Sequence, residues 1–181
     1  VGSEMCIRDR GTRWPDDQAD FWRMDTGQPG DQIFVTGQFG GSILGKHLEF
    51  EPRVNLAREI RDRCRVHAAT DVTDSLAMDL AELARRSGCG FTIFEERIPV
   101  ATAAEDMARK SGQPPLAHAV YDGEDFELIL CLAADQAALL ATDRLNDLQL
   151  TNIGILTADP ACCITQADGD QRELEIRGYV H

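Results

Sequence analysis

The segment from Ala69 to Leu80 constrains the fold more than any other part of the chain. A short apolar run ends at Asp71, and three residues later Asp74 precedes a stretch with helical periodicity. The apolar positions of that stretch share one helical face: Leu76, Leu80 and Leu83. Gly88 provides a stop signal after two arginines. The pattern predicts a strand ending at Asp71, a short turn, and an amphipathic helix over residues 75–87.

The two carboxylates of this segment suit a Mg²⁺ site that holds phosphate. We expect Asp71 at a strand end and Asp74 at a helix start, so that both converge on the helix N-terminus. A bound Mg²⁺ would cancel the repulsion between these acids and phosphate oxygens, and free backbone N–H groups would favour the anion. A simpler alternative stays open, in which Asp74 or Thr73 only caps the helix.

A second acidic segment lies further along the chain. Residues 121–127 read Tyr-Asp-Gly-Glu-Asp-Phe-Glu and run directly into the apolar strand expected at residues 128–132. Carboxylates beside a buried strand are costly unless they face solvent, a metal or a ligand. The second segment therefore supports a functional interpretation of the first.

Together the two segments resemble the thiamine-monophosphate kinases, of the wider family that includes aminoimidazole ribonucleotide synthetase. The C-terminal half of these kinases carries a D-x-S-D-G-L-x-x-D-L motif, then a G-G-E-D-Y-E motif, and ends near G-Y. The matching residues here are 71–80, 122–127 and 178–179, in the same order. Residues 29–37 and 52–54 also look like family segments. The resemblance covers residues 27–181.

The resemblance divides the chain into two parts. We expect residues 27–181 to be a kinase C-terminal domain, and residues 1–26 to be a non-family or artefactual segment, of which residues 1–10 look like a translated sequencing adapter. The N-terminal half of such kinases supplies further metal-binding aspartates, much of the nucleotide pocket and the dimer contacts. The chain therefore reads as a fragment of a homodimeric protein, with little activity on its own.

The order of expected elements favours an α+β fold. The expected strands are residues 32–36, a strand ending at 71, 90–94, 127–132, 151–156, 163–166 and 172–176, the last two forming a hairpin. The expected helices are residues 54–63, 75–87, 102–110 and 135–145, and residues 112–115 form a breaker. The family resemblance implies a layered α/β/α domain with a mixed sheet, like the C-terminal domain of aminoimidazole ribonucleotide synthetase-like proteins.

The function implied by the resemblance is transfer of the ATP γ-phosphoryl group to thiamine monophosphate, which gives thiamine diphosphate. Asp71 and Asp74 match metal-binding aspartates, and Thr73 matches a serine that contacts ATP. Glu124 and Tyr179 match residues that contact the thiamine substrate. We assign no covalent catalytic residue, because such transfer depends mainly on positioning and on charge neutralisation.

Some positions depart from the family motifs. Ser75 and Asp122 stand where the motifs carry glycine, and the nucleotide-contacting arginine upstream of P-G-D aligns with Met24, beside Arg23. Two alternatives to this kinase stay open, and the departures at Ser75 and Asp122 are what the second of them predicts. One is another ATP-dependent member of the superfamily, such as a selenophosphate synthetase-like or hydrogenase-maturation-like enzyme. The other is a non-catalytic binding domain that kept the fold.

Residues 40–47 nearly spell a phosphate-binding P-loop, G-x-x-x-x-G-K-[ST]. His47 stands where that loop needs a hydroxyl ligand for Mg²⁺, and imidazole is a poor substitute. We interpret the segment as a tight glycine turn that lets a helix pack close to a strand.

Charge and hydropathy narrow the choice of partners and location. The net charge is −13, with 31 acidic against 18 basic residues, which disfavours a nucleic acid or an anionic membrane as partner. The sequence shows no membrane-length apolar run and no signal peptide. Its six cysteines lack metal-binding spacing, and the cytoplasm is the expected location.

Overall fold

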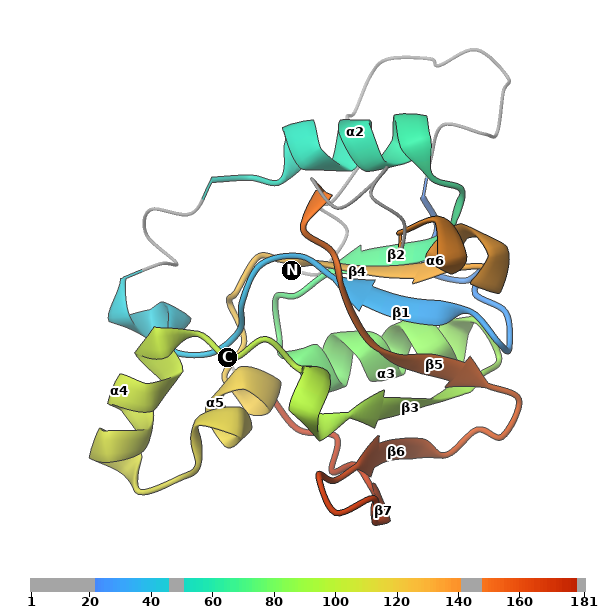
Figure 1. Ribbon diagram of the computed structural model, residues 1–181. Coiled ribbons are helices and arrows are strands. Elements are labelled where there is room, and N and C mark those ends of the chain that lie inside the picture. The colour runs from blue at the N-terminus through green and yellow to red at the C-terminus, as the bar shows by residue number, and fades with distance from the viewer. Residues whose placement is uncertain (1–21, 46–50, 141–147, 179–181) are drawn as a thin grey trace.

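A computed structural model of the chain describes residues 22–45, 51–140 and 148–178. In these residues one sheet has seven strands in the order β2-β4-β1-β5-β3-β6-β7 (Figure 1). The strands are β1 Gln32–Val35, β2 Val66–Asp71, β3 Gly90–Phe94, β4 Leu128–Leu132, β5 Thr151–Thr157, β6 Cys162–Thr165 and β7 Gln171–Glu173. Neighbouring strands are antiparallel except β3 and β6, so the sheet is mixed.

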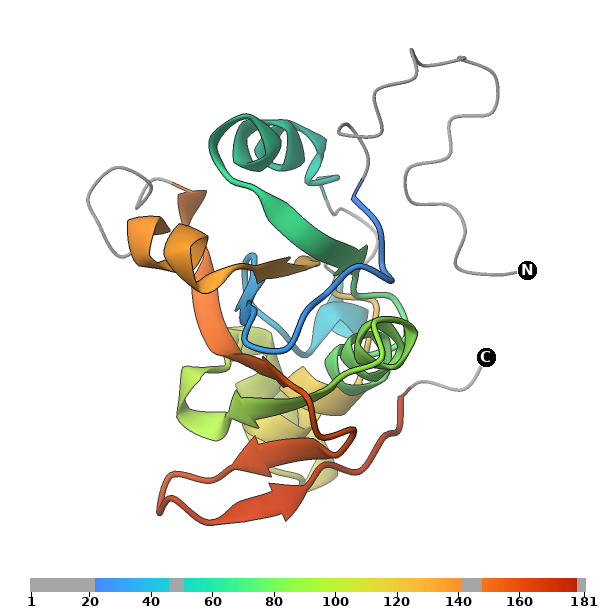
Figure 2. The same cartoon turned by 90° about the vertical axis from the view of Figure 1, so that its right-hand side faces the viewer.

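The helices cover both faces of this sheet (Figures 1 and 2). They are α2 Val54–Arg63, α3 Leu76–Arg86, α4 Thr102–Ser111, α5 Pro115–Tyr121 and α6 Ala134–Leu140, with short 3₁₀ turns η2 Ser42–Leu44 and η3 Glu95–Arg97. Helices α3 and α5 pack on one face, where α4 packs against α5, and α2 and α6 pack on the other.

Alternating side chains along the central strands separate two hydrophobic clusters. In β1, Ile33 and Val35 join the cluster under α3 and α5, while Phe34 joins the cluster under α2 and α6. In β4, Cys131 and Leu130 divide in the same way. A strand places successive side chains on opposite faces, so two buried faces require two helical layers. The layered α/β/α arrangement and the α+β class are confirmed.

Helix α3 forms largely as the sequence predicts, but with a different cap. Leu76, Leu80 and Leu83 are fully buried against the sheet. The N-cap is Ser75, whose hydroxyl oxygen accepts the N–H of Met78 at 3.0 Å. The alternative that Asp74 or Thr73 caps this helix is therefore wrong, and the helix starts at Leu76, one residue later than predicted.

Helix α5 was not predicted. Gly112, with φ +75°, ends α4 in the left-handed conformation, so the expected breaker is present. Pro115 then begins a new helix, because proline fits the first helical position, where no N–H is needed. Helix α6 begins at Ala134, near the expected start, and residues 141–145 of the predicted helix lie outside the described residues.

The glycines of residues 40–45 form a tight packing turn, as interpreted from the sequence. Gly40 and Gly41 have positive φ angles of +93° and +77°. A Cβ atom at Gly40 would lie 2.8 Å from the Ala119 nitrogen, and one at Gly41 would overlap the Ala103 backbone. The missing side chains therefore let α4 and α5 approach this loop closely. Lys46 and His47 lie outside the described residues.

Candidate functional site

The two acidic motifs meet at one end of the sheet. Strand β2 ends at Asp71, which pairs with Leu128 at the start of β4. Beyond this pair, the N–H of Glu124 donates to the Thr73 carbonyl at 2.8 Å. The turn after β2 and the loop before β4 are thus joined by backbone hydrogen bonds, although about 50 residues separate them.

Close backbone contacts add the C-terminal segment to the same place. A Cβ atom at Gly123 would lie closer than 3.0 Å to the Asp74 carbonyl oxygen, and one at Gly178 would lie 2.8 Å from that oxygen. The Ser75 hydroxyl donates to the Arg177 carbonyl at 2.9 Å. Three motifs selected from the sequence therefore surround the turn before α3.

The structure brings most of the expected site residues together. Asp71 is half-buried at the end of β2, and Thr73 and Asp74 are half-buried in the following turn. Glu124 is half-buried in the adjoining loop, with a positive φ of +55°. Tyr179 lies outside the described residues. Among the described residues, no group of three or more His, Cys, Asp or Glu side chains forms a ready metal cage.

Asp79, to which the motifs alone assign no role, anchors the turn. Its Oδ2 atom accepts the N–H groups of Thr73 at 2.9 Å, Asp74 at 3.0 Å and Ser75 at 3.2 Å. These three N–H groups are therefore held by a side chain from the first turn of α3 and are not available to an anion. The sequence does carry a sign that Asp79 is buried, because it falls on the apolar face of the helix between Leu76 and Leu80.

Asp79 has an unusual environment for an acid. Burial raises the pKa of its carboxyl to about 6, with the nearby Asp74 charge adding to the rise and the three backbone N–H groups opposing it. The turn is thus held by a carboxylate that is itself unfavourably desolvated. A buried carboxylate whose hydrogen bonds are all made fixes the backbone conformation of the turn.

We expect Asp79→Ala to destabilise the domain by about 2 kcal/mol, because three N–H groups lose a charged acceptor. Asp79→Asn keeps one acceptor oxygen and is expected to cost less. Glu82→Ala, on the same helix, removes only surface pairs with Arg85 and Arg86 and is expected to cost under about 1 kcal/mol. Urea unfolding of the three variants checks the order, and an Asp79→Ala cost equal to that of Glu82→Ala would contradict the anchoring role.

Two buried acids of the second motif are satisfied by protein groups. Asp125 is 1% exposed and accepts the Gly40 N–H with both oxygens, at 3.1 and 3.2 Å. Glu127, also 1% exposed, accepts two hydrogen bonds from Arg53, at 2.8 and 2.7 Å, and one from Thr36 at 2.7 Å. The expectation that these charges face solvent, a metal or a ligand is wrong for both residues. Glu127 instead ties the two upstream family segments to the site, through Thr36 and Arg53, and Asp125 ties the glycine turn to it.

The departures from the motifs cause no backbone strain. Ser75 has φ −179°, an extended conformation that any residue adopts, and Asp122 has φ −76°. Of the two candidates for the upstream arginine, Met24 packs against the core, and Arg23 is paired with Asp25 at 2.8 and 2.7 Å. Neither side chain is placed toward the turn by these contacts.

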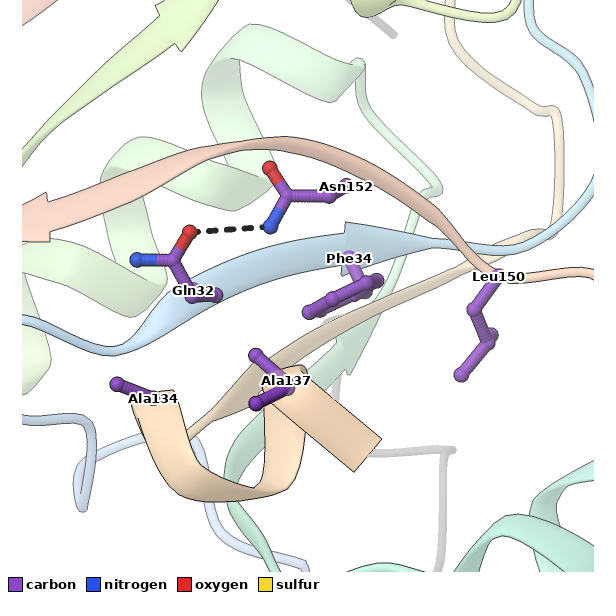
Figure 3. Close-up of a pocket in the computed structure, with 7 residues that line it drawn as sticks. Gln32, Phe34, Ala134, Ala137, Leu150 and Asn152 are labelled. Atoms are coloured by element: carbon purple, nitrogen blue, oxygen red, sulfur yellow. Dashed lines mark hydrogen bonds between the residues drawn. The ribbon is translucent and has the colours of Figure 1, made fainter. Parts of the chain in front are cut away.

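A cavity of about 450 Å³ lies on the opposite face of the sheet, between α6 and strands β1 and β5 (Figure 3). Phe34, Ala137 and Leu150 line it, and the Asn152 amide nitrogen donates to the Gln32 side-chain oxygen at 3.1 Å. None of the expected site residues lines this cavity. This cavity therefore lies apart from the place where the three motifs meet.

Comparison with known proteins agrees with this geometry. The family model for AIR synthase related protein, C-terminal domain, matches residues 28–164. The chain is 46% identical over 160 residues to a thiamine-monophosphate kinase of Rhodopirellula baltica, covering 88% of this chain and 50% of that protein. The chain thus spans about half the length of this curated relative.

Two solved structures share the fold. AaThiL complexed with AMPPCP and TMP superposes with a TM-score of 0.69 and 23% identity, covering 87% of this chain and 53% of that one. Hydrogenase maturation protein HypE in complex with ATP gives a TM-score of 0.64 and 20% identity, covering 86% and 53%. With its family model matched over most of its length, this chain belongs to the AIR synthase related proteins and contains the C-terminal domain of that family.

Proposed function

We propose that the full-length protein transfers the γ-phosphoryl group of ATP to thiamine monophosphate. The observation that carries this proposal is the meeting of the Asp74 turn, the Glu124 loop and the Gly178 segment. The 46% identical relative is a thiamine-monophosphate kinase, and the structural relative AaThiL binds TMP together with AMPPCP, an ATP analogue. This pair of ligands is what a kinase acting on thiamine monophosphate needs.

The donor set suits Mg²⁺. Asp71 and Asp74 offer hard carboxylate oxygens, and Mg²⁺ in phosphoryl-transfer sites usually takes one or two carboxylates together with substrate phosphates. When bound, Mg²⁺ would neutralise charge on the transferring phosphates. We propose Asp71 and Asp74 as its ligands.

The other residues would position the two substrates. We propose that Thr73 contacts the nucleotide, and that Glu124 and Tyr179 contact the thiamine side. The hydrogen bond from the Glu124 N–H to the Thr73 carbonyl links the two subsites through the backbone. The Ser42 hydroxyl donates to the Glu124 carbonyl at 2.6 Å and so also fixes this loop. A linked pair of subsites would hold donor and acceptor phosphates at a constant separation, which is the main requirement of the reaction.

The remaining features of the full-length protein are also proposals. An upstream half would supply further metal ligands, the rest of the nucleotide pocket and a homodimer interface. The net charge of −13 supports a protein that works without nucleic acid or anionic membrane partners, and we propose a cytoplasmic location. Within the described part of the chain, every helix is too short or too polar to cross a bilayer.

The competing functions have less support. HypE shares the fold at 20% identity and AaThiL at 23%, so the structural comparison does not separate the two enzymes. The 46% sequence identity to a thiamine-monophosphate kinase is what favours the kinase. A non-catalytic domain would be favoured if the departures at Ser75 and Asp122 distorted the motifs. Both have ordinary backbone angles.

The test is formation of thiamine diphosphate from ATP, Mg²⁺ and thiamine monophosphate. We expect a version of the protein that includes an upstream half to turn over at roughly 1–10³ per second, and residues 1–181 alone to be far slower. Thiamine without its phosphate is the matched control substrate and should give no thiamine diphosphate. Equal turnover by the 181-residue chain would contradict the need for an upstream half, and no product from the longer protein would contradict the kinase assignment.

A further inference from the structure

A second cavity, of about 270 Å³, adjoins the converging motifs. It lies between α5 and the C-terminal segment, close to where the turn before α3 contacts Gly178. Its lining residues come from three segments: Gln113, Ala117, His118, Tyr121, Asp122, Arg177 and Gly178. Its volume is near the lower end for small-molecule sites, and its wall combines an aromatic ring with charged groups.

A chain of hydrogen bonds holds the Asp122 carboxylate in this cavity wall. The Nδ1 atom of His118 lies 2.8 Å from Asp122 Oδ2, and its Nε2 atom lies 2.7 Å from Ser111 Oγ. Ser111 Oγ in turn accepts the Gln113 N–H at 3.1 Å. A carboxylate only accepts, so Nδ1 donates to Asp122, and Nε2 of a neutral ring accepts from Ser111. The His118 side chain is 8% exposed and is fixed through both ring nitrogens.

The Tyr121 ring in the same wall already faces one planar cation. The Arg177 guanidinium carbon lies 4.4 Å from the ring centroid, an ordinary cation–π distance. Arg177 Nε also lies 3.4 Å from a Glu175 carboxylate oxygen, which offsets its charge. Asp122 thus remains as a carboxylate that His118 holds in place and that lines the cavity, and among the described residues it forms no ion pair with an arginine.

We propose that this cavity binds a planar heterocyclic cation, and that Asp122 is the residue that selects the cation over a neutral ring of the same shape. The inference rests on the proposed function, whose substrate carries a thiazolium ring, and it deepens that function by assigning a role to a residue that departs from the family motif. His118 is a positioning residue that fixes the carboxylate. The Asp122 side chain is only 29% exposed, so solvent screens its charge only in part. Its attraction for a cation bound in the cavity is therefore strong enough to change the binding affinity measurably.

The test compares binding of thiamine with binding of 3-deazathiamine, a neutral analogue in which carbon replaces the thiazolium nitrogen. Every cavity residue belongs to this chain, so calorimetric or NMR titration of the 181-residue protein is sufficient. We expect thiamine to bind about fivefold more tightly than the analogue, the effect of one partly exposed charge. Asp122→Asn keeps the shape and the acceptor but removes the charge, and both it and Asp122→Gly should bring the ratio close to one.

Matched variants separate this role from general effects. Asp62→Asn removes one charge from the exposed surface of α2 and should leave the ratio unchanged. His118→Asn keeps a donor near the Nδ1 position and should preserve the ratio, whereas His118→Gln, which places its donor near Nε2, should reduce it. Failure of thiamine to bind, equal binding of thiamine and the analogue, or a ratio unaffected by Asp122→Asn would overturn the proposal.

The outcome is distinguishable from that of the kinase assay. If Asp122 controls the ratio but the longer protein forms no thiamine diphosphate, the cavity assignment stands and the proposed function fails. If the longer protein is an active kinase and Asp122→Asn leaves the binding ratio unchanged, only the cavity assignment fails.

Discussion

Asp74→Asn is expected to lower phosphoryl transfer by about 10²-fold or more in the longer, active protein while leaving the fold intact. The substitution removes a formal charge from a proposed Mg²⁺ ligand, and loss of one electrostatic group at a phosphoryl or oxyanion site typically has an effect of this size. Asp71→Asn should behave in the same way. The measurement is the rate of thiamine diphosphate formation as a function of Mg²⁺ concentration, for which both variants should require more metal.

The structure makes this substitution a clean test. Ser75, not Asp74, caps α3, and the Asp74 backbone N–H is held by Asp79. Asp74→Asn should therefore change the free energy of unfolding by no more than about 0.5 kcal/mol. Asp135→Asn, in the exposed first turn of α6, is the matched control for the loss of one charge and should keep full activity. Normal activity and unchanged Mg²⁺ dependence of Asp74→Asn would show that its carboxylate is not a metal ligand.

Much of the fold could be predicted because local pattern and tertiary packing agree. Strand β3 and helix α2 have the predicted bounds, and the hairpin of β6 and β7 forms around the turn at residues 167–170. These segments carry regular periodicity between clear stop signals, so propensity and burial select the same structure.

Helix α5 could not be predicted from the same signals. Two consecutive prolines indicate the end of a helix. Pro115, however, is also the first residue of the next helix, a position that proline fits well. The stability of this seven-residue helix comes from its packing against α3 and α4, which no local pattern reports.

The convergence of the motif segments could be predicted from the sequence, but the hydrogen bonds and ion pairs that hold them together could not. The motifs place Asp71, Asp74 and Glu124 near one another, and the structure brings their segments together. The sequence gives no sign that Asp125 and Glu127 are neutralised by the Gly40 N–H and by Arg53, because those partners lie 74 to 85 residues away in the chain. Long-range pairing of buried charges depends on the assembled fold.

Gly123→Ala is expected to have the largest effect on stability, and it tests whether the two acidic motifs must touch. Gly123 has φ +77°, and a Cβ atom there would overlap the Asp74 and Thr73 carbonyl oxygens. An L-residue at this φ costs about 1 kcal/mol, and separating the two loops would also break the hydrogen bond from Glu124 to Thr73. We expect a total loss of about 3 kcal/mol in the free energy of unfolding.

Gly112→Ala provides the matched control, because Gly112 has nearly the same φ, +75°, and nothing lies within 4 Å of its added Cβ atom. This variant carries the conformational cost without the overlap and should lose only about 1 kcal/mol. The difference between the two variants in urea unfolding therefore measures the contact between the motifs. Equal losses would mean that the Gly123 loop moves away from the Asp74 turn at little cost. The loops that carry the proposed nucleotide and thiamine subsites could then move relative to each other easily. The contact between them would not hold the donor and acceptor phosphates at a constant separation.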